Sequence, residues 1–252
     1  MIVRAAVCPS PPLLAPGVTG QVDVLPELRD ACEAAIAWLL AAAPDAVTVI
    51  GPATATATWP PDSVPDPSMH APALHRLARL ARPAAPGLRV DPLSPAPPFP
   101  PHLPLSLVIG AQLLDRAGYA GPRVLQSIAE SASPDACRDL GRDLADDAPL
   151  GALLVMGDGT ARRSAAAPGY LDERAEPFDT VVEQAFRDGD MPALAALDPD
   201  LARDLLAVGR PAWQVLAGAL AAGTPARPST RILYSDAPFG VAYLVATLDP
   251  AR

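Results

Sequence analysis

Short apolar runs that alternate with segments of helical spacing constrain this chain more than any other feature. Residues 2–8, 46–50, 124–128 and 150–156 are rich in aliphatic and β-branched side chains, and the last run is continuously apolar, as central parallel strands are. A helical pattern separates each run from the next. This alternation predicts an α/β fold whose central, mostly parallel or mixed sheet has helices on both faces. A length of 252 residues favours a single domain over residues 1–252.

Proline and glycine mark the boundaries of the expected helices. Pro26 opens a helix in which apolar residues recur every four positions from Leu28 to Leu40, and Pro44 ends it. The other expected helices span residues 105–117, 133–145, 177–187, 199–208 and 211–222, and two closing strands span residues 231–234 and 241–247. The last three helices follow one another without an intervening strand.

A proline-rich segment extends from about residue 54 to 104. So many prolines prevent a continuous strand ladder or helix, and only residues 74–80 and 87–91 resemble a short helix and a short strand. Such a long segment inside a compact domain is often functional, so we expect it to cover one end of the sheet. It contains all three histidines of the chain, His70, His75 and His102. The spacing of His70 and His75 is more typical of a solvent-exposed pair than of a metal site.

Charge and composition argue against several classes of partner. A net charge of −9 and a pI near 4.7 disfavour nucleic-acid binding, which needs a basic face. The most apolar stretch, residues 34–43, is far shorter than the roughly 20 residues of a membrane span. Cys8, Cys32 and Cys137 are widely spaced and predict neither disulfides nor zinc. We therefore expect a cytoplasmic protein with a small-molecule ligand, and the sequence leaves a homodimer open.

Polar residues follow the predicted strands. In open α/β sheets, ligands bind beyond the carboxyl ends of the strands. Ser10, Thr54, Asp158 and Asp236 each come shortly after one of them. We therefore expect these four residues to converge on one cleft at the carboxyl edge of the sheet.

Several motifs along the chain resemble those of one known family. They are Val7-Cys8-Pro9-Ser10-Pro11-Pro12-Leu13-Leu14, Gly51-Pro52, Gly157-Asp158-Gly159, Pro168-Gly169-Tyr170-Leu171-Asp172-Glu173-Arg174 and Ala237-Pro238-Phe239-Gly240-Val241. In these segments the chain resembles the class III extradiol (LigB-type) ring-cleavage dioxygenases, in particular uncharacterised actinobacterial members, and it is distantly similar to Memo-like proteins. The resemblance implies a LigB-like fold and oxidoreductase chemistry at a non-haem Fe(II) centre.

The chain departs from this family at the positions that would bind iron. The resemblance places Ser10 at the first ligand histidine, Thr54 or Ala55 at the second, and Asp236 near the carboxylate ligand. Hydroxyl groups are weak ligands for Fe(II). We therefore expect a degenerate iron site, no cofactor and no ring cleavage, in a protein that binds a small anionic or aromatic ligand. The alternatives are an active Fe(II)-dependent dioxygenase with non-standard ligands, and a metal-independent hydrolase with Asp158 and Asp236 as its acid–base pair.

A charged segment at residues 157–179 is a second candidate site. Arg162 and Arg163 supply guanidinium donors that suit a carboxylate or a phosphate. Two glycines flank Asp158 and permit unusual backbone angles there. The same residues are equally typical of salt bridges that anchor a loop. The sequence therefore leaves both an anion-binding site and a structural salt-bridge network open.

Overall fold

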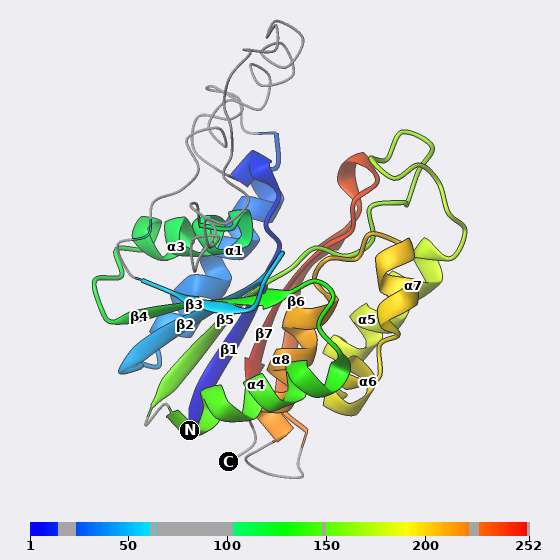
Figure 1. Cartoon of the computed structure of the whole chain (residues 1–252). Coiled ribbons are helices and arrows are strands. Elements are labelled where there is room, and N and C mark those ends of the chain that lie inside the picture. The colour runs from blue at the N-terminus through cyan, green and yellow to red at the C-terminus, as the bar shows by residue number, and fades with distance from the viewer. Residues whose placement is uncertain (15–23, 61–62, 64–102, 148–149, 222–226, 251–252) are drawn as a thin grey trace, which may run out of the picture.

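The computed structural model describes residues 1–14, 24–60, 63, 103–147, 150–221 and 227–250. Within them, seven strands form one sheet in the order β3-β4-β2-β5-β1-β7-β6 (Figure 1). The strands are β1 (Ile2–Cys8), β2 (Ala46–Ala53), β3 (Ala57–Trp59), β4 (Arg123–Ala129), β5 (Gly151–Met156), β6 (Ser229–Asp236) and β7 (Tyr243–Asp249). The predicted α/β fold is confirmed.

The centre of the sheet is parallel and its margins are antiparallel. β4, β2, β5 and β1 are parallel neighbours, and β5 is buried along its whole length, as its apolar run predicted. β3 is antiparallel to β4, β7 to β1, and β6 to β7. Because the direction reverses twice between β1 and β6, the carboxyl end of β6 lies at the same sheet edge as that of β1.

Helices cover both faces of the sheet, as the alternation predicted (Figure 1). They are η1 (Pro12–Leu14), α1 (Pro26–Leu40), α3 (Leu105–Arg116), α4 (Pro134–Asp147), α5 (Ala175–Arg187), α6 (Met191–Ala195), α7 (Pro199–Asp204), α8 (Arg210–Ala221) and η3 (Pro238–Gly240). One apolar core contains α1 and α3, and the other contains α4 to α8. Neighbouring strand residues alternate between them: Val7 lies in the core with α8, whereas Ala6 and Cys8 lie in the core with α1.

The proline-rich segment begins with a strand that the sequence did not indicate. β3 pairs with β4 only three residues after Thr54. The hydroxyl of Ser127, on β4, accepts hydrogen bonds from the Ala57 amide at 3.1 Å and from the Trp59 indole Nε1 at 2.9 Å. This strand depends on a partner about 70 residues away, which is why local patterns did not reveal it.

Between β5 and β6, the residues that the structure describes form four helices, not the predicted three. The additional helix is α6, where the Asp190 carboxylate accepts a hydrogen bond from the Ala193 amide at 3.0 Å. The next helix, α7, ends at Asp204 rather than at residue 208. Leu206 adopts a left-handed conformation with φ of 58°, which stops the helix there.

Other predictions fall outside the described residues or concern membranes. His70, His75, His102 and the expected elements at 74–80 and 87–91 lie outside the part of the chain that the structure describes. Among the described helices, none combines the length and the apolar character needed to cross a membrane.

Candidate functional site

The carboxyl ends of β1, β2 and β5 meet at a cleft of about 330 Å³. Ser10, Thr54 and Asp158 all line it, so the structure brings together three of the four predicted strand-end residues. The lining is Ser10, Pro12, Pro52, Ala53, Thr54, Pro104, Leu105, Ser106, Glu130, Asp158 and Val208. Most of these side chains are apolar. The volume falls within the range typical of small-molecule pockets.

Asp158 is the most perturbed acidic group in the cleft. Its Oδ1 accepts a hydrogen bond from the backbone amide of Ser10 at 2.7 Å, which joins the ends of β5 and β1. Burial raises the pKa of Asp158 to about 6, and the Ser10 amide opposes part of this rise. The carboxyl therefore changes its charge close to neutral pH, which suits proton exchange or charge-dependent ligand binding.

Two polar lining residues, Glu130 and Ser106, were not singled out from the sequence. Glu130 directly follows β4, so the rule applied to the other strand ends could have found it. Ser106 lies in the first turn of α3, and its hydroxyl donates a hydrogen bond to the Pro52 carbonyl oxygen at 2.8 Å. No local pattern distinguishes this serine from others in the chain.

Asp236 does not join the cleft, so the predicted convergence is wrong for this residue. It is exposed at the end of β6, where its carboxylate accepts a hydrogen bond from the Ala237 amide at 2.7 Å. It lines a second pocket, of about 250 Å³, together with Arg163, Asp179 and Glu183. β7 separates β6 from β1 in the sheet, and this intervening strand keeps Asp236 out of the cleft. Asp158 and Asp236 therefore line different pockets rather than one acid–base site.

Arg163 is engaged in ion pairs with α5. Its guanidinium lies 3.2 Å from the Asp179 carboxylate and 3.5 Å from that of Glu176. Asp179 also accepts hydrogen bonds from the Thr160 amide at 3.0 Å and from the Thr160 hydroxyl at 2.6 Å. Burial is the main influence on Asp179 and raises the pKa of its carboxyl, while these partners hold the rise back. Arg163 thus ties the loop after β5 to a helix.

Arg162 differs from its neighbour. Its Nε atom is buried and has no hydrogen-bond partner among the described residues, and its Cγ packs against Gly169. Neither Arg162 nor Arg163 lines the cleft that holds Asp158.

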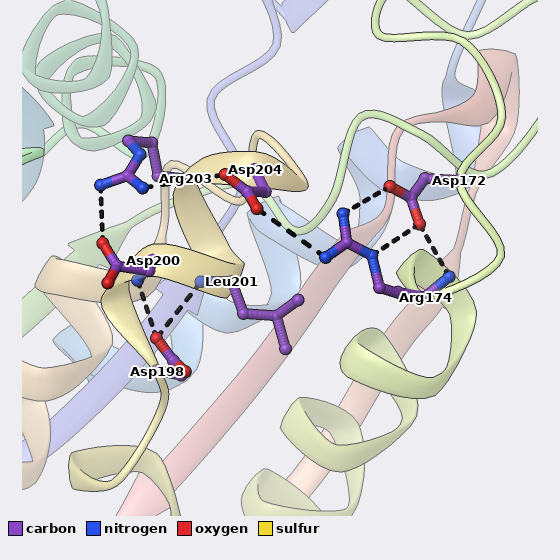
Figure 2. Close-up of polar contacts among 7 residues, drawn as sticks. All are labelled: Asp172, Arg174, Asp198, Asp200, Leu201, Arg203 and Asp204. Carbon is purple, nitrogen blue, oxygen red and sulfur yellow. Dashed lines mark hydrogen bonds and ion pairs between the residues drawn. The ribbon is translucent and has the colours of Figure 1, made fainter.

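The rest of the charged segment forms a surface network with α7 (Figure 2). The Arg174 guanidinium lies 2.9 Å from Asp172 and 3.8 Å from Asp204, and it holds the pKa of the Asp172 carboxyl down at about 2. Arg203 pairs with Asp200 at 2.7 Å in the same view. These ion pairs are typical of a structural salt-bridge network, which was one of the two alternatives that the sequence left open.

The residues at the positions implied for iron do not fit Fe(II). Serine and threonine hydroxyls and an alanine methyl group replace the imidazoles that this ion prefers. The implied carboxylate, Asp236, lines another pocket. Among the residues that the structure describes, no three His, Cys, Asp or Glu side chains gather where they could hold a metal ion.

Comparisons with known proteins reveal a likeness of overall shape. No family model and no curated protein matches the chain. A solved structure, that of the uncharacterized protein JW3007 from Escherichia coli K12, is similar with a TM-score of 0.49 and 17% sequence identity. The likeness covers 97% of this chain and 99% of that one. At this level of identity it concerns the fold alone.

Proposed function

We propose that the cleft between β1, β2 and β5 binds a small molecule with an aromatic or other apolar body and a hydrogen-bond donor directed at Asp158, and that the protein does not cleave aromatic rings. The observation that carries this proposal is the placement of one perturbed carboxyl in a mostly apolar cleft of about 330 Å³. Proline, leucine and valine side chains provide an apolar surface against which an aromatic ring can pack. The Asp158 carboxylate among them fixes the orientation of a donor.

The charge of the lining supports the aromatic rather than the anionic ligand class, both of which were expected from the sequence. Among the described residues, the ionisable side chains that line the cleft are Asp158 and Glu130, which are both acidic. A carboxylate or phosphate ligand would be repelled there, and Arg162 and Arg163 lie elsewhere. The cleft therefore favours a neutral aromatic donor, such as a phenol, or an aromatic amine over an anion.

A binding assay with matched variants tests the proposal. Protein treated with EDTA is titrated by calorimetry with catechol, tyramine and benzoate at pH 5 and pH 8. We expect catechol or tyramine to bind, more tightly at pH 8 because Asp158 is then ionised, and benzoate not to bind. Asp158→Asn should weaken binding about tenfold, as expected for the loss of a charge-assisted hydrogen bond worth roughly 1.5 kcal/mol.

Asp236→Asn serves as the control, because this carboxylate lines the other pocket and its loss should leave binding unchanged. Binding that depends on Asp236 and not on Asp158 would contradict the proposed site. A separate anaerobic incubation with Fe(II), followed by catechol and oxygen, should give no ring-cleaved product. Product formation would support an active dioxygenase with non-standard ligands instead.

A further inference from the structure

Three loops expose large apolar side chains. Tyr170 and Leu171 lie in the loop between β5 and α5, Leu206 follows α7, and Phe239 lies in η3. Tyr170 is 75% exposed and Phe239 is 61% exposed, although both are aromatic. We refer to Tyr170, Leu171, Leu206 and Phe239 as the loop patch.

Backbone contacts hold these three loops together. Leu206 packs closely on Gly169. A Cβ atom added to Gly169 would lie only 2.7 Å from the Cδ1 atom of Leu206. The Ala161 amide donates a hydrogen bond to the Leu205 carbonyl at 3.1 Å. On the other side, the Arg163 amide donates to the Gly240 carbonyl at 3.0 Å. Figure 1 shows the loop after β5 running from η3 to the region of α7. Members of the loop patch are therefore carried by directly contacting segments.

The backbone under the loop patch is strained. Tyr170, Leu206 and Phe239 have φ values of 60°, 58° and 58°, in the left-handed region that bulky residues rarely adopt. Glycine or asparagine would relieve this strain. For Tyr170 and Phe239, burial of the side chain within the monomer does not compensate for the strain, because both side chains are largely exposed. Strain of this kind is typical of positions kept for binding.

We propose that the loop patch is the interface through which two copies of this chain form a twofold dimer. A twofold interface places the same surface on both sides and must therefore be self-complementary. A chain with a net charge of −9 repels its own copy over most faces. Beside the loop patch, however, both signs of charge are present: Arg174 pairs with Asp172 and Asp204, and Arg203 pairs with Asp200 (Figure 2). An aromatic centre with a polar rim that carries both signs of charge is typical of protein–protein interfaces.

The available area fits a reversible dimer. Fully covered aromatic side chains bury roughly 150–250 Å² each. From their exposed fractions, Tyr170 and Phe239 supply about a third of the roughly 800 Å² that each partner contributes to a standard interface. Leu171, Leu206 and the charged rim must supply the remainder. The dimer should therefore dissociate measurably at micromolar concentrations of the full chain.

Sedimentation velocity of the wild-type chain and of a Tyr170→Asn, Phe239→Asn double variant tests this inference. Asparagine tolerates the left-handed conformation and removes the aromatic surface. We expect the wild type to shift from monomer to dimer with concentration, and the double variant to dimerise at least tenfold more weakly. Its melting temperature, measured under conditions where both proteins are monomeric, should be unchanged or higher because strain is relieved.

A Val124→Thr variant is the matched control, because Val124 is an exposed apolar residue on β4, several strands away from β6. It should dimerise like the wild type. A wild type that stays monomeric at every concentration would overturn the inference, as would a double variant that dimerises normally. A lower melting temperature of the monomeric double variant would also overturn it, by showing that the aromatic side chains stabilise the monomer. None of these measurements depends on the ligand of the cleft.

Discussion

At the scale of single residues, Asp158 makes stability depend on pH. The pKa of this carboxyl is about 6, above its value in an unfolded chain, so the folded protein binds the proton more tightly. Its contribution is therefore most favourable below about pH 4 and is lost as the pH rises through 6. In Asp158→Asn the side chain cannot ionise, so this loss of stability at higher pH disappears. The asparagine oxygen can still accept the hydrogen bond from the Ser10 amide. Between pH 4 and pH 7.5, we expect the free energy of unfolding of the variant to rise by about 2–3 kcal/mol relative to that of the wild type, as measured by urea unfolding. If the difference in unfolding free energy between the variant and the wild type stayed constant across this range, it would contradict the raised pKa of Asp158.

Arg163 should act on stability rather than on ligand binding. Removing its guanidinium leaves the largely buried Asp179 carboxylate with Thr160 as its remaining hydrogen-bond partner. We expect Arg163→Ala to lower the free energy of unfolding by about 1–2 kcal/mol and to leave the binding of cleft ligands unchanged. Arg203→Ala is the control, because its pair with Asp200 is exposed and worth less than about 1 kcal/mol. Equal effects of the two substitutions would argue against the structural role of Arg163.

At the scale of elements, glycines set the distance between α4 and α8. A Cβ atom on Gly141 would lie 2.2 Å from the Val215 carbonyl oxygen, and one on Gly218 would lie 2.5 Å from that of Arg138. Alanine improves helix propensity by about 1 kcal/mol, but here it collides with the backbone of the other helix. We expect Gly141→Ala to destabilise the protein by about 2 kcal/mol or more in thermal or urea unfolding. Asp143→Ala, at an exposed position of the same helix, should change stability little, and a stabilised Gly141→Ala variant would contradict this packing.

At the scale of the whole molecule, buried Arg210 joins distant segments. Its guanidinium donates hydrogen bonds to the carbonyls of Glu130 at 2.6 Å and Ala132 at 2.7 Å, and to the Gln214 side chain at 2.8 Å. Gln214 in turn donates to the Ala195 and Leu197 carbonyls, each at 3.0 Å. The pair thus connects the turn after β4, α8 and the link between α6 and α7.

Loss of the Arg210 hydrogen bonds should destabilise both the turn after β4 and the link between α6 and α7. Arg210→Met keeps the apolar stem but leaves buried carbonyl oxygens without donors, which costs about 3 kcal/mol or more. We expect faster amide hydrogen exchange around residues 130–133 and 193–198 together, because both lose their common partner. Faster exchange confined to α8 itself would show that Arg210 acts only locally.

Much of this protein follows from the sequence by itself. Apolar runs and helical spacing predicted the central strands and most helices, because the period of side chains along a segment is a local property. The rule that ligands bind beyond parallel strand ends placed Ser10, Thr54 and Asp158 in one cleft. The ligand expected to occupy that cleft, and the absence of ring cleavage, stay predictions.

Only the tertiary structure decided the features that depend on contacts between distant residues. The sequence could not separate Asp236 from Asp158, because the position of β7 between β6 and β1 is a matter of topology. It left the arginines open between a ligand and a salt bridge, and the packing of α5 supplied Asp179 as the partner of Arg163. Likewise, β3 forms because β4 offers it a ladder and the Ser127 hydroxyl. These partners lie 16 to 70 residues apart in the chain, and local composition does not reveal such pairs. Their roles could be recognised only in the folded structure, where they are in contact.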